Sequence, residues 1–220
     1  MAEAKKSARE PTAATVSFIT TEHFTLQGAR SQTVSEATGR ASIFLASVSG
    51  GLVALGLMAA AAHLGTAFYA LALTLLPTLA FVGLVTFDRV LQNRFEDLNY
   101  ANRIARLRGF YFEHAPELDA YLLSVPPERR LLVQGLPEGL WQNFVTIAGM
   151  VAVITSVLAG ASVALLVAVV ANHSPASALA AGGAVTSAAL VALMRHQYSA
   201  WTRRLAAGRR VASLTADTSP

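Results

Sequence analysis

Cysteine is absent from this chain of 220 residues, and charged residues are absent from two long stretches of it. Without cysteine, disulfide bonds, thiolate nucleophiles and cysteine metal sites are all excluded. No Asp, Glu, Lys or Arg occurs in the 47 residues from Ala41 to Phe87 or in the 56 residues from Gly139 to Met194. A membrane crossing needs about 20 apolar residues, so each stretch is long enough for two helices.

These uncharged stretches determine the expected fold class. Each contains turn-forming residues near its middle, at His63–Thr66 and at Asn172–Pro175. The sequence therefore predicts an all-α polytopic membrane protein with four transmembrane helices in two hairpins and a helical cytoplasmic layer. We expect the four crossings at about 41–62, 66–87, 141–171 and 175–194.

The residues before the first crossing are polar and have no sustained hydrophobic period. They cannot bury enough apolar surface to order themselves, so we predict a disordered cytoplasmic arm at residues 1–30. No signal peptide is expected, because Val16–Ile19 is shorter than the roughly 7–15 apolar residues that one needs. Thr33-Val34-Ser35-Glu36 has the form of a capping box, which predicts a helix start. The membrane domain is then residues 31–208, and residues 209–220 form a disordered tail.

The second crossing is expected to continue as a helix, because neither Gly nor Pro occurs between Asp88 and Gly109. Two apolar stripes lie on nearly opposite sides of it. One consists of Phe87, Leu91, Phe95 and Leu98, and the other consists of Tyr100, Ile104, Leu107 and Tyr111. Either the helix breaks near Asn99, or its two halves pack against different neighbours. Short helices beginning at Pro116 and Pro126 complete a cytoplasmic layer at residues 88–138, and a basic extension at residues 195–208 follows the fourth crossing.

The positive charges predict the orientation. All 17 Lys and Arg residues lie outside the two uncharged stretches, and neither hairpin turn contains one. The positive-inside rule therefore places both termini in the cytoplasm, with His63 and His173 on the other side. Arginine outnumbers lysine by 15 to 2, which is typical of GC-rich bacteria, so we expect a multi-pass protein of the bacterial inner (plasma) membrane.

The third crossing has a ladder of small residues at four-residue spacing: Ala148, Ala152, Ser156, Gly160, Ala164 and Ala168. Close approach at small residues supplies packing energy between helices in lipid, where hydrophobic burial supplies none. Five steps of this spacing sweep about 200° over roughly 30 Å, so different neighbours should contact the two ends of the ladder. The alternative is that an alanine-rich helix produces such a run by chance.

The second crossing contains Pro77, which predicts a bend because proline frees the Leu73 carbonyl. The hydroxyls of Thr74 and Thr78 are expected to satisfy that carbonyl. With other hydroxyls of the crossings they form a candidate pore lining, which consists of Thr74, Thr78, Ser156, Ser162, Thr186 and Ser187. The simpler interpretation is that each hydroxyl bonds to a carbonyl of its own helix.

No metal, cofactor or catalytic site is predicted, and an enzyme is the least favoured class. His114 lies near Glu113, Glu117 and Asp119, but a helix start at Pro116 explains these acids without a metal. His63 and His173 are most simply solvated loop residues. Nucleic acid is not an expected partner, because the basic residues are not gathered on one segment with interleaved aromatics.

Clustered arginines flank the crossings and could contact anionic lipid or an acidic partner; these are Arg103, Arg106, Arg108, Arg203 and Arg204. The segment Arg103-Ile104-Ala105-Arg106-Leu107-Arg108-Gly109-Phe110-Tyr111 resembles one found after the second crossing in an uncharacterised group of bacterial four-helix membrane proteins. A hairpin followed by a basic helix also resembles the SLATT modules, two-crossing membrane effectors that are proposed to form pores. This chain differs from them in having two hairpins and no attached sensor domain.

Packing-competent helices and an apolar stripe outside the membrane both require partners. The sequence therefore predicts a homo-oligomeric integral membrane protein that forms a pore or channel-like assembly among membrane lipids. The alternative is a non-conducting membrane scaffold that binds other proteins.

Overall fold

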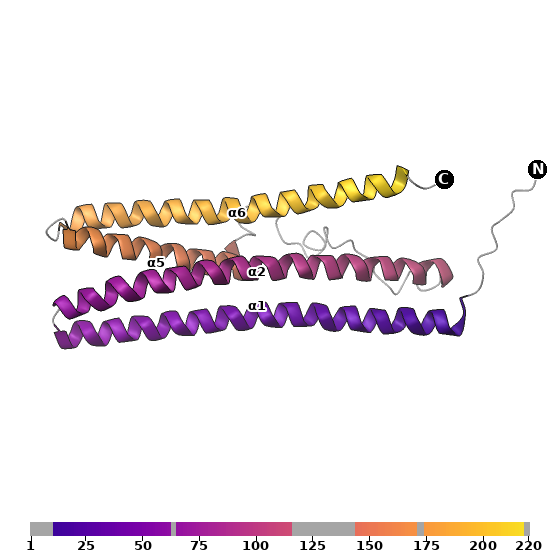
Figure 1. The fold of residues 1–220 in the computed structure, drawn as a ribbon, viewed down its shortest axis with the longest axis horizontal. Helices are drawn as coiled ribbons and strands as arrows, with labels where there is room; N and C mark the ends of the chain where they lie inside the picture. Colours follow the sequence, from indigo (N-terminus) through magenta and orange to yellow (C-terminus); the bar gives the residue numbers. More distant parts are fainter. Residues whose placement is uncertain (1–10, 63–64, 116–143, 171–173, 218–220) are drawn as a thin grey trace, which may run out of the picture. The chain divides into compact units, whose positions relative to one another are not determined.

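The fold is given by a computed structural model of the chain. It describes residues 11–62, 65–115, 144–170 and 174–217, with the backbone alone for residues 62 and 204–217. The described residues form four α-helices and no strand (Figure 1), namely α1 (Ala13–Ala62), α2 (Thr66–His114), α5 (Ile147–Val170) and α6 (Pro175–Asp217). Each helix is long and apolar enough to cross a membrane. The prediction of an all-α protein with four such helices is confirmed.

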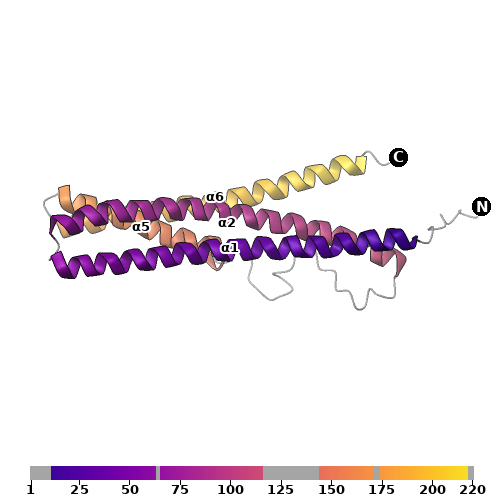
Figure 2. The same ribbon diagram turned by 60° about the horizontal axis from the view of Figure 1, so that its bottom comes forward.

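The chain divides into two compact units, and each unit joins segments that are distant in the sequence. The first, which we call the polar unit, contains residues 11–36 and 92–115 of the described chain. The second, the membrane unit, contains residues 37–91 and the described residues from 144 onward. Helices α1 and α2 are uninterrupted (Figure 2), and each contributes one part to each unit.

The predicted disordered arm at residues 1–30 is wrong for residues 13–30, which belong to α1. The helix begins after Thr12, whose Oγ1 accepts a hydrogen bond of 3.3 Å from the Thr15 amide. The capping box expected at Thr33 is also wrong, because Thr33 lies inside α1 and its hydroxyl donates to the Arg30 carbonyl at 2.8 Å. The segment is rich in threonine, a weak helix former. Its helix is stabilised by packing, since Leu26 and Thr33 are both buried.

Helix α2 runs through Asn99 without interruption, so the predicted break there is wrong. Residues of both apolar stripes are buried, among them Phe95 and Ile104. The part of α2 in the polar unit pairs with α1 through Arg30–Asp97 and Arg103–Glu22. The part in the membrane unit contacts other residues of α1 and also contacts α5, as described below.

The ends of the last two helices also differ from the prediction. Helix α5 begins at Ile147 rather than near residue 141, because the Thr146 hydroxyl accepts a hydrogen bond of 3.0 Å from the Gly149 amide and caps the helix. No charged residue marks this start, so hydropathy alone could not locate it. Helix α6 continues to Asp217, so the predicted disordered tail is wrong for residues 209–217. The short helices expected at Pro116 and Pro126 lie outside the described residues.

The core of the membrane unit forms where small residues let helices approach closely. A Cβ atom added at Gly51 of α1 would lie 2.9 Å from Leu79 Cδ1 of α2. A Cβ atom added at Gly83 of α2 would lie 2.9 Å from the Phe44 ring of α1 and would collide with the Thr155 hydroxyl of α5. Glycine is therefore required at Gly83 for α2 to contact α1 and α5 together.

Candidate functional site: helix faces and an arginine groove

The small-residue ladder of α5 lies largely in the core of the membrane unit. Ala148, Ala152, Ser156 and Gly160 are buried, and Ala164 and Ala168 are half-buried. A Cβ atom added at Gly160 would lie 2.5 Å from the carbonyl oxygen of Gly182 in α6. One end of the ladder therefore packs on α6 through backbone contact, as the small-residue pattern predicts.

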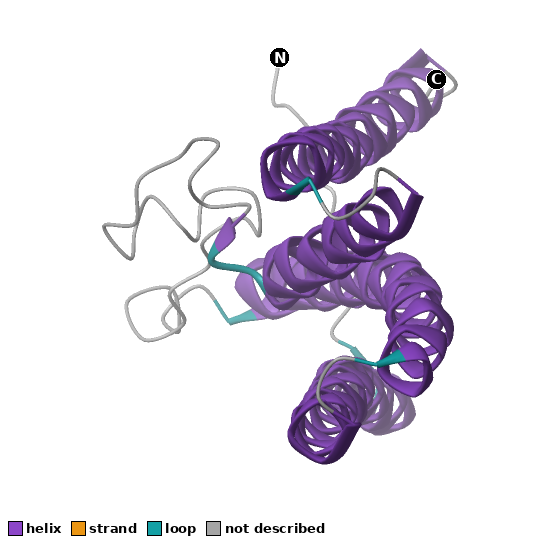
Figure 3. Ribbon diagram, turned by 90° about the vertical axis from the view of Figure 1, so that its left-hand side faces the viewer, coloured by secondary structure: helices purple, strands orange, loops and turns teal. Residues whose placement is uncertain are grey.

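The ladder helix has a second neighbour on its other side. Thr155 of α5 is buried and contacts Gly83 of α2. Contacts within the membrane unit thus join α1 to α2, α2 to α5, and α5 to α6. Helix α2 also contacts α6 farther along, where the rings of Phe87 and His196 have centroids 6.4 Å apart. Figures 1 and 3 show the same order, with α1 and α6 at opposite ends of the row. The two end helices each have one face that no helix of this row covers.

One stripe on the uncovered side of α1, which we call the α1 outer face, is made of small residues at alternating three- and four-residue spacing. All of them are exposed, and they are Gly39, Ser42, Ala46, Ser49, Val53, Gly56 and Ala60. Larger exposed residues lie beside this stripe, namely Ile43, Leu52 and Leu57. A Cβ atom added at Gly39 or Gly56 would have no neighbouring atom within 4 Å. A helix face that only contacted lipid would have no need of so many small side chains.

Helix α6 has a similar uncovered face, the α6 outer face, formed by Ala176, Ala180, Gly183 and Ser187, all of which are exposed. A Cβ atom added at Gly183 would also meet open space. The neighbouring residue Gly182, by contrast, is buried against Ala164 of α5. Neither outer face could be identified from the sequence, because that requires knowing which side of each helix is buried.

The predicted pore-lining hydroxyls do not share one surface. Thr74 and Thr78 are exposed on α2, whereas Ser156 is 0% exposed in the core, so a single lining that contains all of them is wrong. Thr74 donates to the Ala70 carbonyl at 2.9 Å and Thr78 to the Thr74 carbonyl at 2.7 Å. The expectation that they satisfy the Leu73 carbonyl is therefore also wrong. Helix α2 continues through Pro77.

Ser156 and Ser162 likewise donate to carbonyls of their own helix, at 2.8 and 2.7 Å. Thr186 contacts Gly160 and so belongs to the packing of α5 on α6. Ser187 is the exception, because it is exposed on the α6 outer face. Most of these hydroxyls therefore donate a hydrogen bond to a carbonyl of their own helix or contact a neighbouring helix.

Comparison with protein-family models, with curated proteins and with solved structures found no match. The helix faces and grooves of the chain are therefore the features that bear on its function.

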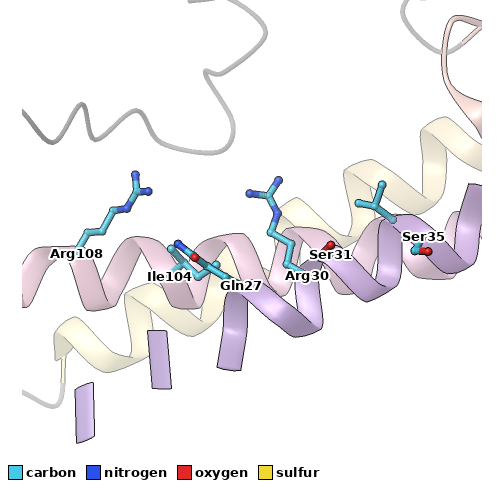
Figure 4. Close-up of a pocket in the computed structure, with 7 residues that line it drawn as sticks. Gln27, Arg30, Ser31, Ser35, Ile104 and Arg108 are labelled. Atoms are coloured by element: carbon cyan, nitrogen blue, oxygen red, sulfur yellow. The ribbon is translucent and has the colours of Figure 1, made fainter. Parts of the chain in front are cut away.

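The polar unit contains a groove of about 530 Å³ between α1 and α2. It is lined by Gln27, Arg30, Ser31, Val34, Ser35, Ile104 and Arg108. Arg30 and Arg108 extend to the same side of the two helices (Figure 4). Arg30 donates from Nε to Asp97 Oδ1 at 2.6 Å and from Nη2 to Asp97 Oδ2 at 3.3 Å.

A guanidinium group has five N–H donors, so its pairing with Asp97 leaves three on Arg30. Asp97 thus holds the Arg30 side chain in place while other donors remain available. With Arg108, this arrangement can bind an anionic group such as a carboxylate or a phosphate. Arg108 was predicted from the sequence as a contact residue, whereas Arg30 was not, because its only signal was its isolation among uncharged residues.

The other predicted contact arginines differ in their surroundings. Arg103 donates from Nη2 to Glu22 Oε1 at 2.8 Å, and Arg106 is exposed. Arg203 donates to Ser199 Oγ at 3.3 Å, and the side chain of Arg204 lies outside the described residues.

His114, near the end of α2, contacts a residue of its own helix. His114 stacks on Phe110 with ring centroids 4.1 Å apart, and its Nδ1 lies 2.9 Å from the Phe110 carbonyl. Within the described ranges no three His, Asp or Glu side chains cluster as metal ligands would. Glu117, Asp119, His63 and His173 lie outside those ranges.

One buried polar residue was missed by the sequence analysis. Asn93 in α2 is 1% exposed, and neither atom of its amide group has a hydrogen-bond partner in the described part of the chain. Burial also lowers the pKa of the neighbouring Arg94 guanidinium from its ordinary value. Asn93 lies three residues after the buried Val90, and that helical spacing was the available signal.

Proposed function

We propose that the protein is a homo-oligomeric integral membrane protein whose chains associate through the α1 and α6 outer faces. The observation that carries this proposal is the row of seven exposed residues on the α1 outer face, in which Val53 has the largest side chain. Small side chains let backbones approach closely, and this approach is the main source of helix association in lipid. The exposed residues of α2 include larger side chains, such as Phe81 and Leu84.

The position of these faces favours a head-to-tail contact, in which the α1 outer face of one chain packs on the α6 outer face of the next. The α1 outer face and the α6 outer face are different surfaces at opposite ends of one row of helices. A contact between two different surfaces is heterologous, and its repetition closes into a ring when the rotation permits. The chains would then repeat around an axis that is normal to the membrane.

A closed ring of this kind encloses a central path, and we propose that the assembly acts as a pore or channel. A non-conducting scaffold for other proteins remains the alternative function of the same ring. Ion flux through liposomes that contain the purified protein separates the two. Flux that requires the protein supports the pore, whereas liposomes that remain sealed at every pH and voltage support the scaffold.

Cysteine cross-linking tests the contact itself, because the chain contains no cysteine of its own. Gly56 lies six residues before the end of α1, and Ala180 lies five residues after the start of α6. Gly56 is therefore about 9 Å from the end of α1, and Ala180 is about 7.5 Å from the start of α6, so the two positions have similar depths in the membrane. Chains with Gly56→Cys mixed with chains with Ala180→Cys should form a disulfide-linked dimer on mild oxidation, and a chain with both changes should form longer oligomers.

The matched control is Ala70→Cys, which is exposed on α2 at a similar depth and should not cross-link with either partner. Chains with Gly56→Cys alone should form no disulfide-linked dimer after oxidation. If chains with Gly56→Cys alone instead form disulfide-linked dimers, and chains with both cysteines form nothing larger, α1 packs on α1 and the proposed ring is wrong. If no combination forms a disulfide, the proposed association through these faces is wrong.

We also propose that the protein resides in a bacterial inner membrane with both termini in the cytoplasm. The support is the distribution of Lys and Arg, which avoids both hairpin turns.

A further inference from the structure

A second groove, of about 540 Å³, lies in the membrane unit near the start of α5. It is lined by Phe144, Leu190, Val191, Met194, Arg195, Tyr198 and Ser199. Apart from Phe144, these residues form one stripe along α6 from Leu190 to Ser199, a rise of about 13.5 Å. The volume is within the range of roughly 300–1,000 Å³ that is typical of small-molecule sites.

The polarity of this groove changes along its length. Its first residues, Leu190, Val191 and Met194, are apolar and end the long uncharged stretch of the sequence. Arg195 is the first charged residue after that stretch, and Tyr198 and Ser199 follow it. The groove therefore runs from the depth of the hydrocarbon core to the depth of the headgroups.

The polar end of the groove is positively charged. Arg195 is exposed and makes no ion pair or hydrogen bond with any described residue. Arg203 Nη2 lies 3.3 Å from Ser199 Oγ, which brings a second guanidinium to the same end. No Asp or Glu occurs from Gly139 to Ala216, so this hairpin has no carboxylate of its own to neutralise them.

We propose that this groove binds one anionic phospholipid of the membrane leaflet at that side. Its phosphate contacts Arg195 and accepts a hydrogen bond from the hydroxyl of Tyr198, a residue that is 55% exposed. The Ser199 hydroxyl does not donate to the lipid, because it donates to the His196 carbonyl at 3.0 Å. An acyl chain lies along Leu190 and Met194. The proposal requires α6 to cross the membrane and is independent of association between chains.

Native mass spectrometry of the full-length protein in detergent tests this site with added phosphatidylglycerol or phosphatidylcholine. A guanidinium at the membrane surface increases the affinity for an anionic lipid about fivefold. Phosphatidylglycerol should therefore bind at least about fivefold more tightly than phosphatidylcholine. Arg195→Gln should remove this preference. Arg40→Gln, which removes a charge just before the first crossing, should leave it unchanged.

Filling the apolar half of the groove tests the acyl-chain site. Val191→Trp should weaken the binding of both lipids, and it should fold because Val191 is 56% exposed. Glycerol phosphate, which has no acyl chain, should not compete. The proposal is overturned if the three variants bind phosphatidylglycerol alike, if the wild type binds both lipids equally, or if glycerol phosphate displaces the lipid.

Discussion

Two adjacent glycines of α6 allow a sharp test of the packing in the membrane unit. A Cβ atom added at Gly182 would lie 2.6 Å from Ala164 Cβ and 2.9 Å from the Gly160 carbonyl oxygen. A Cβ atom added at Gly183 would have no atom within 4 Å. The two residues lie on the same helix at the same depth, so they differ only in what their side chains would meet.

The expected effects of Gly182→Ala and Gly183→Ala have opposite signs. Carbon atoms prefer a separation of about 3.5–4.0 Å, so Gly182→Ala requires α5 and α6 to separate by roughly 1 Å. Overpacking of this kind costs about 1–3 kcal/mol. Gly183→Ala replaces a glycine inside a helix without a steric conflict, which stabilises the helix by about 0.5–1 kcal/mol. The free energies of unfolding should therefore differ by about 1.5–4 kcal/mol.

Reversible unfolding in mixed micelles, followed by circular dichroism, measures this difference. The experiment uses a low ratio of protein to detergent, so that association through the α6 outer face does not contribute. Equal free energies of unfolding for the two variants would refute the close contact of α5 with α6. Gly160→Leu should for the same reason destabilise the protein far more than Leu165→Ala.

Three further predictions concern other parts of the chain. Asn93→Leu should raise the free energy of unfolding by about 1–3 kcal/mol in denaturant titration, because it removes a buried amide that has no described hydrogen-bond partner; a lower stability would show that this amide is satisfied. A double-mutant cycle with Arg30→Ala and Asp97→Ala should give a coupling energy of about 0.5–1 kcal/mol, since both side chains are about one-third exposed; zero coupling would mean that the pair does not order the groove. Reporters fused at His63 and at His173 should both appear on the side of the membrane opposite to the amino terminus, and a reporter on the same side would contradict the proposed orientation.

The membrane helices could be predicted from the sequence because charge is so costly in lipid. Uncharged stretches of 47 and 56 residues left few alternatives to two hairpins. The ladder on α5 also correctly predicted close helix packing, since Gly160 contacts α6. Small residues at regular spacing are a local signal, and α5 packs on α6, which follows it directly in the sequence.

The polar unit could not be predicted in the same way. Residues 13–30 are helical although their composition is unfavourable, and their ion pairs are made with residues 67 and 81 positions away in the sequence. Local propensity does not include such partners. The groove around Arg30 depends on the same pairing. The outer faces of α1 and α6 were missed for a related reason, because small residues occur on several sides of both helices and only the fold distinguishes the buried side.

The proposed association of chains is the central claim, and the mass of the protein in lipid nanodiscs tests it most directly. The chain has a mass of 23.1 kDa. The account predicts a protein mass that is a fixed multiple of this value, reduced to a single chain when Gly56→Leu and Ala180→Leu place large side chains on the two outer faces. A wild-type mass equal to one chain at every protein concentration would contradict it.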